Sequence, residues 1–254
     1  MSAPQGLALE TRSLCKNFGA LTVADDINFR LEAGARHALI GPNGAGKTTF
    51  INMLTGVLRP SSGHIVLAGE NITQVAQASR VKRGLGRTFQ INALFRGLAV
   101  LDNVALAVAE RRGVARRTWR SASSHADVRD ESLQLLATLG LADDASQRIL
   151  DLPYGKQRLV EIAIALGLRP SVLLLDEPAA GVPSVESHRI LQVLDNLPKH
   201  IAILIIEHDM DVVFRFAQRI TVLVQGQVLV EGPPEEISKD RRVHQVYLGE
   251  QRHA

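Results

Sequence analysis

Apolar residues alternate with polar ones along the first part of the chain. LALETRSL and TVADDINFRLEAG predict two antiparallel strands, with turns at Phe18-Gly19 and Ala33-Gly34. ARHALIG at 35–41 predicts a short buried strand, and a helix is expected from about Lys47 to Thr55 after a glycine-rich turn. HIVLAGENI at 64–72 is typical of a further strand and turn. This part of the chain is therefore expected to be rich in strands.

The spacing of apolar residues then becomes helical and later returns to alternation. Between 73 and 150, LAVLDNVALAVA and ESLQLLATLGL place apolar residues three and four apart, which predicts an inserted helical lobe. From 172 onward, strands are predicted at VLLLD, IAILIIE, ITVLVQ and QVLVEG, with helices through ILQVLDNL and MDVVFRFA. Strands separated by helices indicate a mostly parallel sheet that is covered on both faces.

The composition is that of an ordinary globular protein, with 254 residues of which 46% are hydrophobic. Cys15 is the single cysteine, so no internal disulfide can form. MSAPQGLALE has neither the charged nor the apolar region of a signal peptide. The longest apolar run, IAILII at 201–206, is far shorter than the ~20 residues that span a bilayer. We therefore expect a chain without membrane spans of its own.

Basic residues form one dense cluster within a net charge of +3. A solvated helix face explains such a cluster, and so does a surface that lies near lipid phosphates or an acidic partner. Nucleic-acid binding is not expected, because Trp119 is the one aromatic residue among these arginines. The cluster consists of Arg111, Arg112, Arg116, Arg117 and Arg120.

GPNGAGKT at 41–48 matches the phosphate-binding pattern G-x-x-x-x-G-K-[ST] and lies between a predicted strand and a predicted helix. In such a loop, backbone N–H groups converge on the phosphates, and the helix N-terminus adds its positive dipole end. Lys47 is expected to reach the β- and γ-phosphates, and Thr48 to ligate Mg²⁺. The predicted nucleotide contacts are Gly41, Pro42, Asn43, Gly44, Ala45, Gly46, Lys47, Thr48 and Thr49.

Two carboxylates follow the apolar run of VLLLDEP at 172–178. Asp176 is expected at the C-terminal end of a buried strand, where ligands of open α/β sheets bind. Its carboxylate suits the Mg²⁺ sphere, and Glu177 can take a proton from an attacking water.

The order of these motifs resembles that of the ATP-binding cassette (ABC) ATPases. GPNGAGKTT, GRTFQ (86–90), LPYGKQR (152–158), LLLDEP and IIEHD (205–209) follow one another as in that family. KNFGALTVADDI, LDNV and the terminal VYLGE are similar to the ATPases of branched-chain amino-acid uptake systems. The resemblance implies an α/β P-loop NTPase fold with a mostly parallel core, an antiparallel β subdomain and the helical lobe. One domain over 7–250 is expected, with its core at about 7–90 and 165–250 and its lobe at about 91–164.

The resemblance also assigns the segment LPYGKQR, which is the signature motif of the family. Two cassettes pack head to tail, and each signature helix points its N-terminus at the γ-phosphate held by the other. Tyr154 and Gly155 are the candidate contacts here. Pro153 stands where the family has serine, and Pro183 stands where it has Asp or Asn, so both departures affect the contact between cassettes.

Three further site residues are implied by the resemblance. Phe18 is expected to stack on adenine, Gln90 to contact Mg²⁺ and the attacking water, and His208 to reach the γ-phosphate. The remaining histidines are expected to be surface or space-filling side chains, and Mg²⁺ is the one metal expected. Those histidines are His37, His64, His125, His188, His200, His244 and His253.

The expected function is ATP hydrolysis that energises a membrane permease for uptake of branched-chain or related amino acids. The implied partners are integral-membrane permease subunits, a second ABC ATPase (identical or different) and, indirectly, an extracytoplasmic solute-binding protein. The expected location is the cytoplasmic face of the plasma membrane. Alternatives are a soluble ABC ATPase acting on DNA or the ribosome, a P-loop small-molecule kinase, and an importer ATPase for urea or another small solute.

Overall fold

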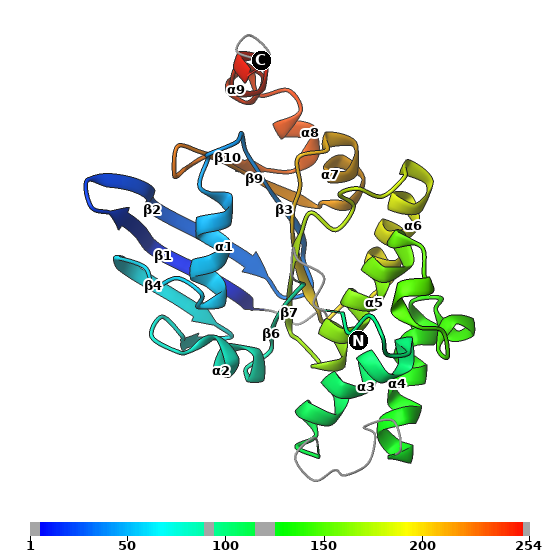
Figure 1. Cartoon of the computed structure of the whole chain (residues 1–254). Helices are drawn as coiled ribbons and strands as arrows, with labels where there is room; N and C mark the ends of the chain where they lie inside the picture. The colour runs from blue at the N-terminus through cyan, green and yellow to red at the C-terminus, as the bar shows by residue number, and fades with distance from the viewer. Residues whose placement is uncertain (1–5, 89–93, 115–124, 251–254) are drawn as a thin grey trace. The chain divides into compact units, whose positions relative to one another are not determined.

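The computed structural model describes residues 6–88, 94–114 and 125–250, without the side chains of 184, 185 and 248–250. The chain forms two compact units. Unit 1 consists of Met1–Leu85, Ser171–Glu177 and Pro198–Ala254, and unit 2 of Gly86–Pro170 and Pro178–Leu197. Figure 1 labels the elements of both. The expected helical lobe lies within the first segment of unit 2, while 178–197 was expected with the core.

Unit 1 contains an antiparallel sheet with the strand order β2-β1-β4-β5. Its two long strands are β1 (Leu7–Phe18) and, at one edge, β2 (Leu21–Glu32), which pair antiparallel up to Phe18 and Leu21. The two short strands are β4 (Ser62–Leu67) and β5 (Glu70–Asn71). The predicted antiparallel β subdomain is confirmed.

The second sheet has the order β10-β9-β3-β8-β7-β6. Its central strand β3 pairs in parallel with β8 and β9, and β7 pairs in parallel with β8, whereas β10 is antiparallel to β9. The mostly parallel sheet that the alternation predicted is thus confirmed. The strands are β3 (Arg36–Ile40), β6 (Leu85–Arg87), β7 (Val172–Asp176), β8 (Ala202–Ile206), β9 (Arg219–Val224) and β10 (Gln227–Gly232).

The core of unit 1 lies around helix α1 (Lys47–Thr55), between the two sheets (Figure 1). Phe50, Ile51, Met53 and Leu54 of this helix are completely buried against apolar side chains of both sheets. Because burial of each such side chain stabilises the fold by about 1.5–3 kcal/mol, this packing holds the start of α1 in a fixed place. The other helices of the unit are α2 (Gln77–Lys82), α7 (Met210–Phe216), α8 (Pro234–Ile237) and α9 (Arg241–Glu250).

Unit 2 is helical. It contains α3 (Val100–Arg111), α4 (Ala126–Thr138), α5 (Tyr154–Gly167) and α6 (Ser184–Asp195), with short 3₁₀ helices at Ala142–Asp144 and Ile149–Asp151. Prolines precede two of these helices, since Pro153 is the N-cap of α5 and Pro183 the N-cap of α6. Neither proline offers a side-chain acceptor, so neither helix has a side-chain N-cap.

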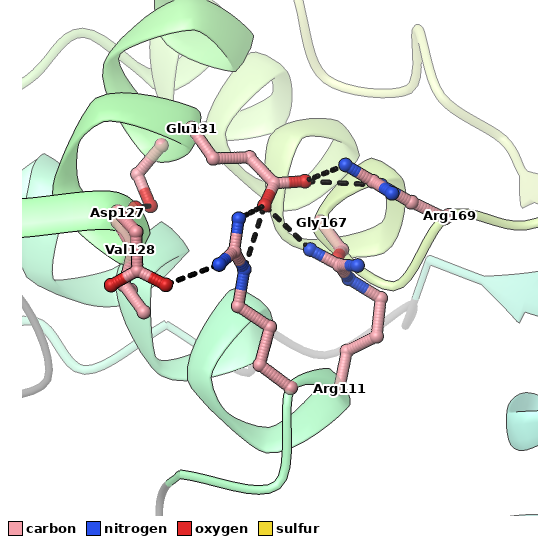
Figure 2. Close-up of polar contacts among 8 residues, drawn as sticks. Arg111, Asp127, Val128, Glu131, Gly167 and Arg169 are labelled. Atoms are coloured by element: carbon pink, nitrogen blue, oxygen red, sulfur yellow. Dashed lines mark hydrogen bonds and ion pairs between the residues drawn. The ribbon is translucent and has the colours of Figure 1, made fainter. Parts of the chain in front are cut away.

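One carboxylate joins the middle of α4 to the C-terminal ends of α3 and α5 in unit 2 (Figure 2). Glu131 of α4 accepts hydrogen bonds from Arg111 at 2.7 Å, Arg112 at 2.7 Å and Arg169 at 3.0 Å. Arg112 also pairs with Asp127, and Arg111 Nε donates to the carbonyl of Gly167 at the end of α5. These two arginines of the predicted basic cluster are therefore engaged within the chain. Arg116, Arg117 and Arg120 lie outside the described residues.

Candidate active site

The loop between β3 and α1 has a backbone that only glycine permits. A Cβ on Gly41 would collide with the backbone carbonyl oxygen of Leu223 in β9. Gly44 and Gly46 have φ values of 76° and 99°, in the left-handed region that favours glycine. The pattern G-x-x-x-x-G therefore reflects close packing at one end of the loop and backbone conformation at the other.

The N-terminus of α1 has a polarity that favours an anion. Gly46 is its N-cap and supplies no side-chain acceptor, and the first turn contains no acidic residue. The first N–H groups of a helix point along its axis and carry the positive end of the helix dipole. Thr48 is exposed in this first turn. This arrangement suits a phosphate group.

Lys47 turns back over the loop that precedes it. Its Nζ donates hydrogen bonds to the carbonyl oxygens of Gly41 at 2.5 Å and Pro42 at 2.9 Å. These carbonyls hold the ammonium group beside the loop.

The acidic pair lies at the C-terminal end of β7 in the same unit. Asp176 is the last residue of that strand and is 7% exposed. Glu177 follows with φ of 47°, a conformation that non-glycine residues rarely adopt, and its N–H donates to the carbonyl of Ile206 in β8 at 2.9 Å. Such strain is maintained only where the surrounding structure fixes it, and it clusters at functional sites.

His208 follows β8 and lies beside Glu177. Its Nδ1 is 3.5 Å from Glu177 Oε1. The histidine side chain is 66% exposed and that of the glutamate 33%, so both groups are accessible to water. The two side chains therefore lie together at the C-terminal ends of the neighbouring strands β7 and β8.

Phe18 ends β1 with its side chain 49% exposed. The Nζ atom of Lys16 lies 4.9 Å from the centroid of its ring. An exposed ring with a cation on its face is available for stacking with a planar group.

The comparisons with known proteins decide the family. The ABC transporter model matches residues 24–180, and the branched-chain amino acid ATP-binding cassette transporter model matches 227–253. This chain belongs to the ABC transporter ATP-binding proteins. It is an ATPase whose activity is coupled to transport by a membrane permease, and it carries the C-terminal segment of the branched-chain amino acid group.

The similarity to known proteins extends over nearly the whole of this chain. The branched-chain amino acid transport ATP-binding protein LivG of Escherichia coli (strain K12) is 36% identical over 95% of this chain and 98% of its own length. The lipopolysaccharide export ATP-binding protein LptB of Acidithiobacillus ferridurans is 36% identical over 96% and 97%. A crystal structure of an ABC transporter cassette in its ADP conformation has a TM-score of 0.86 at 29% identity, covering 96% of this chain and 99% of that one.

In unit 2 of this ABC protein, the predicted signature residues open helix α5. Tyr154 is 38% exposed and its ring is stacked by Arg158, whose Nη1 donates to Glu161 at 2.8 Å. Burial acts to lower the pKa of Arg158, but the hydrogen bond and charge of Glu161, together with Tyr154, outweigh it and raise the pKa overall. Gly155 is buried against α6, where a Cβ would collide with the carboxylate of Glu186. The signature glycine is thus required by packing.

Sequence reasoning did not identify Gly226, which holds the phosphate loop of this ABC protein in place. Its N–H donates to the carbonyl of Ala45 at 3.0 Å, and its own carbonyl accepts from Asp25 at 2.9 Å. A Cβ there would collide with the backbone of Val23. The only signal in the sequence was the turn between two predicted strands, ITVLVQ and QVLVEG.

A divalent metal can be held in this ABC site by oxygen donors. Asp176 and Thr48 offer a carboxylate and a hydroxyl, which are the hard ligands that Mg²⁺ prefers, with phosphate oxygens and waters completing its sphere. Within the described residues, no group of three or more His, Cys, Asp or Glu side chains could hold a metal. Gln90 lies outside those residues.

Proposed function

We propose that this chain binds ATP with Mg²⁺ at the P-loop of unit 1. The observation that carries the proposal is the uncapped N-terminus of α1 behind GPNGAGKT, with Asp176 and Glu177 at the end of β7 in the same unit. The loop from Gly41 to Thr49 binds the phosphates, and Lys47 leaves its loop carbonyls to pair with them. Thr48 and Asp176 ligate Mg²⁺, and Gln90 joins them by resemblance to the family.

Glu177 acts as general base in this proposal. Its carboxylate accepts a proton from the water that attacks the γ-phosphate, and His208 donates a hydrogen bond to that phosphate. Support comes from the 3.5 Å separation of the two side chains and from the unusual backbone of Glu177. Phe18, exposed at the end of β1, stacks on adenine.

We further propose that two cassettes, identical or different, assemble head to tail. In this arrangement the N-terminus of α5, with Tyr154 and Gly155, faces the γ-phosphate of the second subunit. Support comes from the absence of a side-chain cap at this helix start and from the half-exposed ring of Tyr154. A helix N-terminus without a cap is suited to an anion.

The proposed cargo is a branched-chain or related amino acid. Overall identity does not separate the alternatives, since relatives that bear amino-acid transport and lipopolysaccharide export names are both 36% identical to this chain. The C-terminal match over 227–253 favours amino-acid uptake. The described helices include none that is both long and apolar enough to cross a membrane. Permease subunits therefore carry the cargo, and the chain docks on them at the cytoplasmic face, with a solute-binding protein outside.

Capture of the native complex tests this function. An affinity tag on the chain should retain integral membrane proteins in detergent, and the complex in proteoliposomes should take up leucine or isoleucine only with ATP and a solute-binding protein. Urea serves as the competing small solute. Capture of ribosomes or DNA instead of membrane proteins would contradict the proposal, and uptake of urea alone would contradict the cargo.

A further inference from the structure

The N-terminus of helix α5 is covered by a carboxylate from the same unit. Glu186 of α6 lies against the α-carbon of Gly155, so that a Cβ there would collide with Oε2 and would lie 3.1 Å from Cδ. Gly155 has an ordinary helical backbone, so glycine is required here by the position of Glu186 and not by φ. The first hydrogen bond within α5 joins the N–H of Gln157 to the carbonyl of Pro153, at 3.1 Å. The N–H groups before Gln157 therefore have no acceptor within the helix.

The two cations in the first turns of α5 are engaged by other carboxylates. Lys156 pairs with Asp144 at 2.7 Å, and Arg158 pairs with Glu161 at 2.8 Å. Glu186 forms no ion pair with any of the residues that the structure describes. A bare carboxylate thus lies at the positive end of the α5 dipole, where an anion is favoured.

We propose that Glu186 lowers the ATP affinity of the composite site by holding a negative charge at the signature glycine. The inference rests on the proposed function, in which this helix start faces the γ-phosphate of the second subunit. An incoming phosphate meets like charge, and the cassettes close only when Glu186 is displaced or repelled. Removal of the charge favours closure, because the repulsion is lost while the backbone donors stay in place.

The test measures ATP-dependent association of two copies of the full chain. In a Glu177→Gln background, which is expected to retain ATP unhydrolysed, association is followed by sedimentation while ATP with Mg²⁺ is titrated. Glu186→Gln should lower the ATP concentration at half-maximal association by about three- to tenfold. This difference should shrink when salt rises from about 0.05 M to about 0.5 M, since salt screens charge repulsion.

Two further variants separate charge from packing. Glu186→Asp keeps the charge, so its ATP concentration at half-maximal association (the midpoint) should be close to that of the Glu177→Gln parent. Glu110→Gln removes one charge from an exposed position on α3 and should leave the midpoint unchanged. Thermal unfolding of every variant confirms that the fold is intact.

A failure of this inference and a failure of the proposed head-to-tail assembly give different results. The inference is wrong if Glu186→Gln reaches half-maximal association at the same ATP concentration as the Glu177→Gln parent. It is also wrong if the lower ATP requirement of Glu186→Gln does not depend on salt. In both cases the proposed dimer is still supported. If Glu186→Gln does not fold, a midpoint for Glu186→Asp below that of the parent overturns the inference, and an unchanged midpoint supports it. If no variant associates at any ATP concentration, the proposed assembly of two copies is itself wrong.

Discussion

At the scale of single residues, a chain of buried polar contacts begins near the N-terminal end of β3. His37 of β3 is 1% exposed, and its Nε2 lies 2.8 Å from the hydroxyl of Thr221 in β9. That hydroxyl donates to Glu231 of β10 at 2.7 Å, and Arg219 donates to the same carboxylate at 2.6 Å. The ring of Phe29 packs edge-on against the imidazole at 5.0 Å. His37 was expected to be a surface or space-filling side chain. It is buried against Phe29, and it also hydrogen-bonds to a strand residue that lies 184 positions later in the chain, which no local pattern could show.

His37 makes the stability of the protein depend on pH. Burial lowers the pKa of His37 from 6.5 to about 4; the charge of Glu231 acts in the opposite direction, and that of Arg219 lowers the pKa further. The folded state therefore favours the neutral ring, and the resulting stability is present above pH 6.5 and is lost as pH falls towards 4. From this residue we expect the free energy of unfolding to be about 2 kcal/mol lower at pH 5 than at pH 7.

Urea unfolding of the wild type and of His37→Gln at these two pH values checks this expectation. The glutamine amide can still bond to Thr221 but does not titrate, so the loss between pH 7 and pH 5 should largely disappear. An equal loss in both proteins would assign the pH dependence to other groups.

Site residues differ in how far the sequence could reveal them. The P-loop lysine and the Asp176–Glu177 pair were predictable because each follows a buried strand within one short motif. Gly226 and Glu186 were not, since each acts through a neighbour that the fold brings from elsewhere in the chain. Gln90 and the roles of Phe18 and His208 stay predictions.

At the scale of elements, Glu131 ties the C-terminal ends of α3 and α5 to the middle of α4 (Figure 2). Burial acts to raise the pKa of Glu131, but hydrogen bonds from Arg112 and Arg111 outweigh it and lower the pKa below 4.5. The stability that this carboxylate gives is thus present above pH 4.5 and is lost below it. We expect Glu131→Gln to reduce the free energy of unfolding by about 1–2 kcal/mol, because three guanidinium groups lose their shared anion.

Asp130 offers a matched control on the same helix. It is exposed and forms no ion pair with the residues described in the structure, so Asp130→Asn should change stability by less than about 0.5 kcal/mol. Chemical unfolding at pH 7 in low salt measures both variants. Equal effects of the two changes would show that the arginine contacts of Glu131 do not stabilise the unit.

Elements with a clear hydrophobic period could be predicted, and short ones could not. The helix from Lys47 to Thr55 has the predicted bounds. The strand β6 (Leu85–Arg87) was not expected, because three residues around a glycine show no period. The arginine cluster looked uniform in sequence, yet Arg111 and Arg112 meet Glu131 through contacts between helices that no local pattern shows.

At the scale of the whole molecule, the order of motifs predicted the family correctly, and the fold class with it. The division into units was harder to predict. Residues 178–197 follow β7 directly, and their helical pattern is compatible with either unit. In the proposed function, residues of unit 1 bind the ATP of this chain. The start of α5 in unit 2 contacts the ATP that is bound by the second subunit.

The central claim is that Glu177, at the end of β7, is the base for ATP hydrolysis. Steady-state ATPase activity of the purified chain and of Glu177→Gln, together with equilibrium binding of ATP, tests it most directly. Glu235→Gln, an exposed change in the same unit, is the control and should retain wild-type turnover. We predict that Glu177→Gln binds ATP within about threefold of the wild type but hydrolyses it roughly 10²–10⁴-fold more slowly. Turnover near that of the wild type in Glu177→Gln would contradict the account.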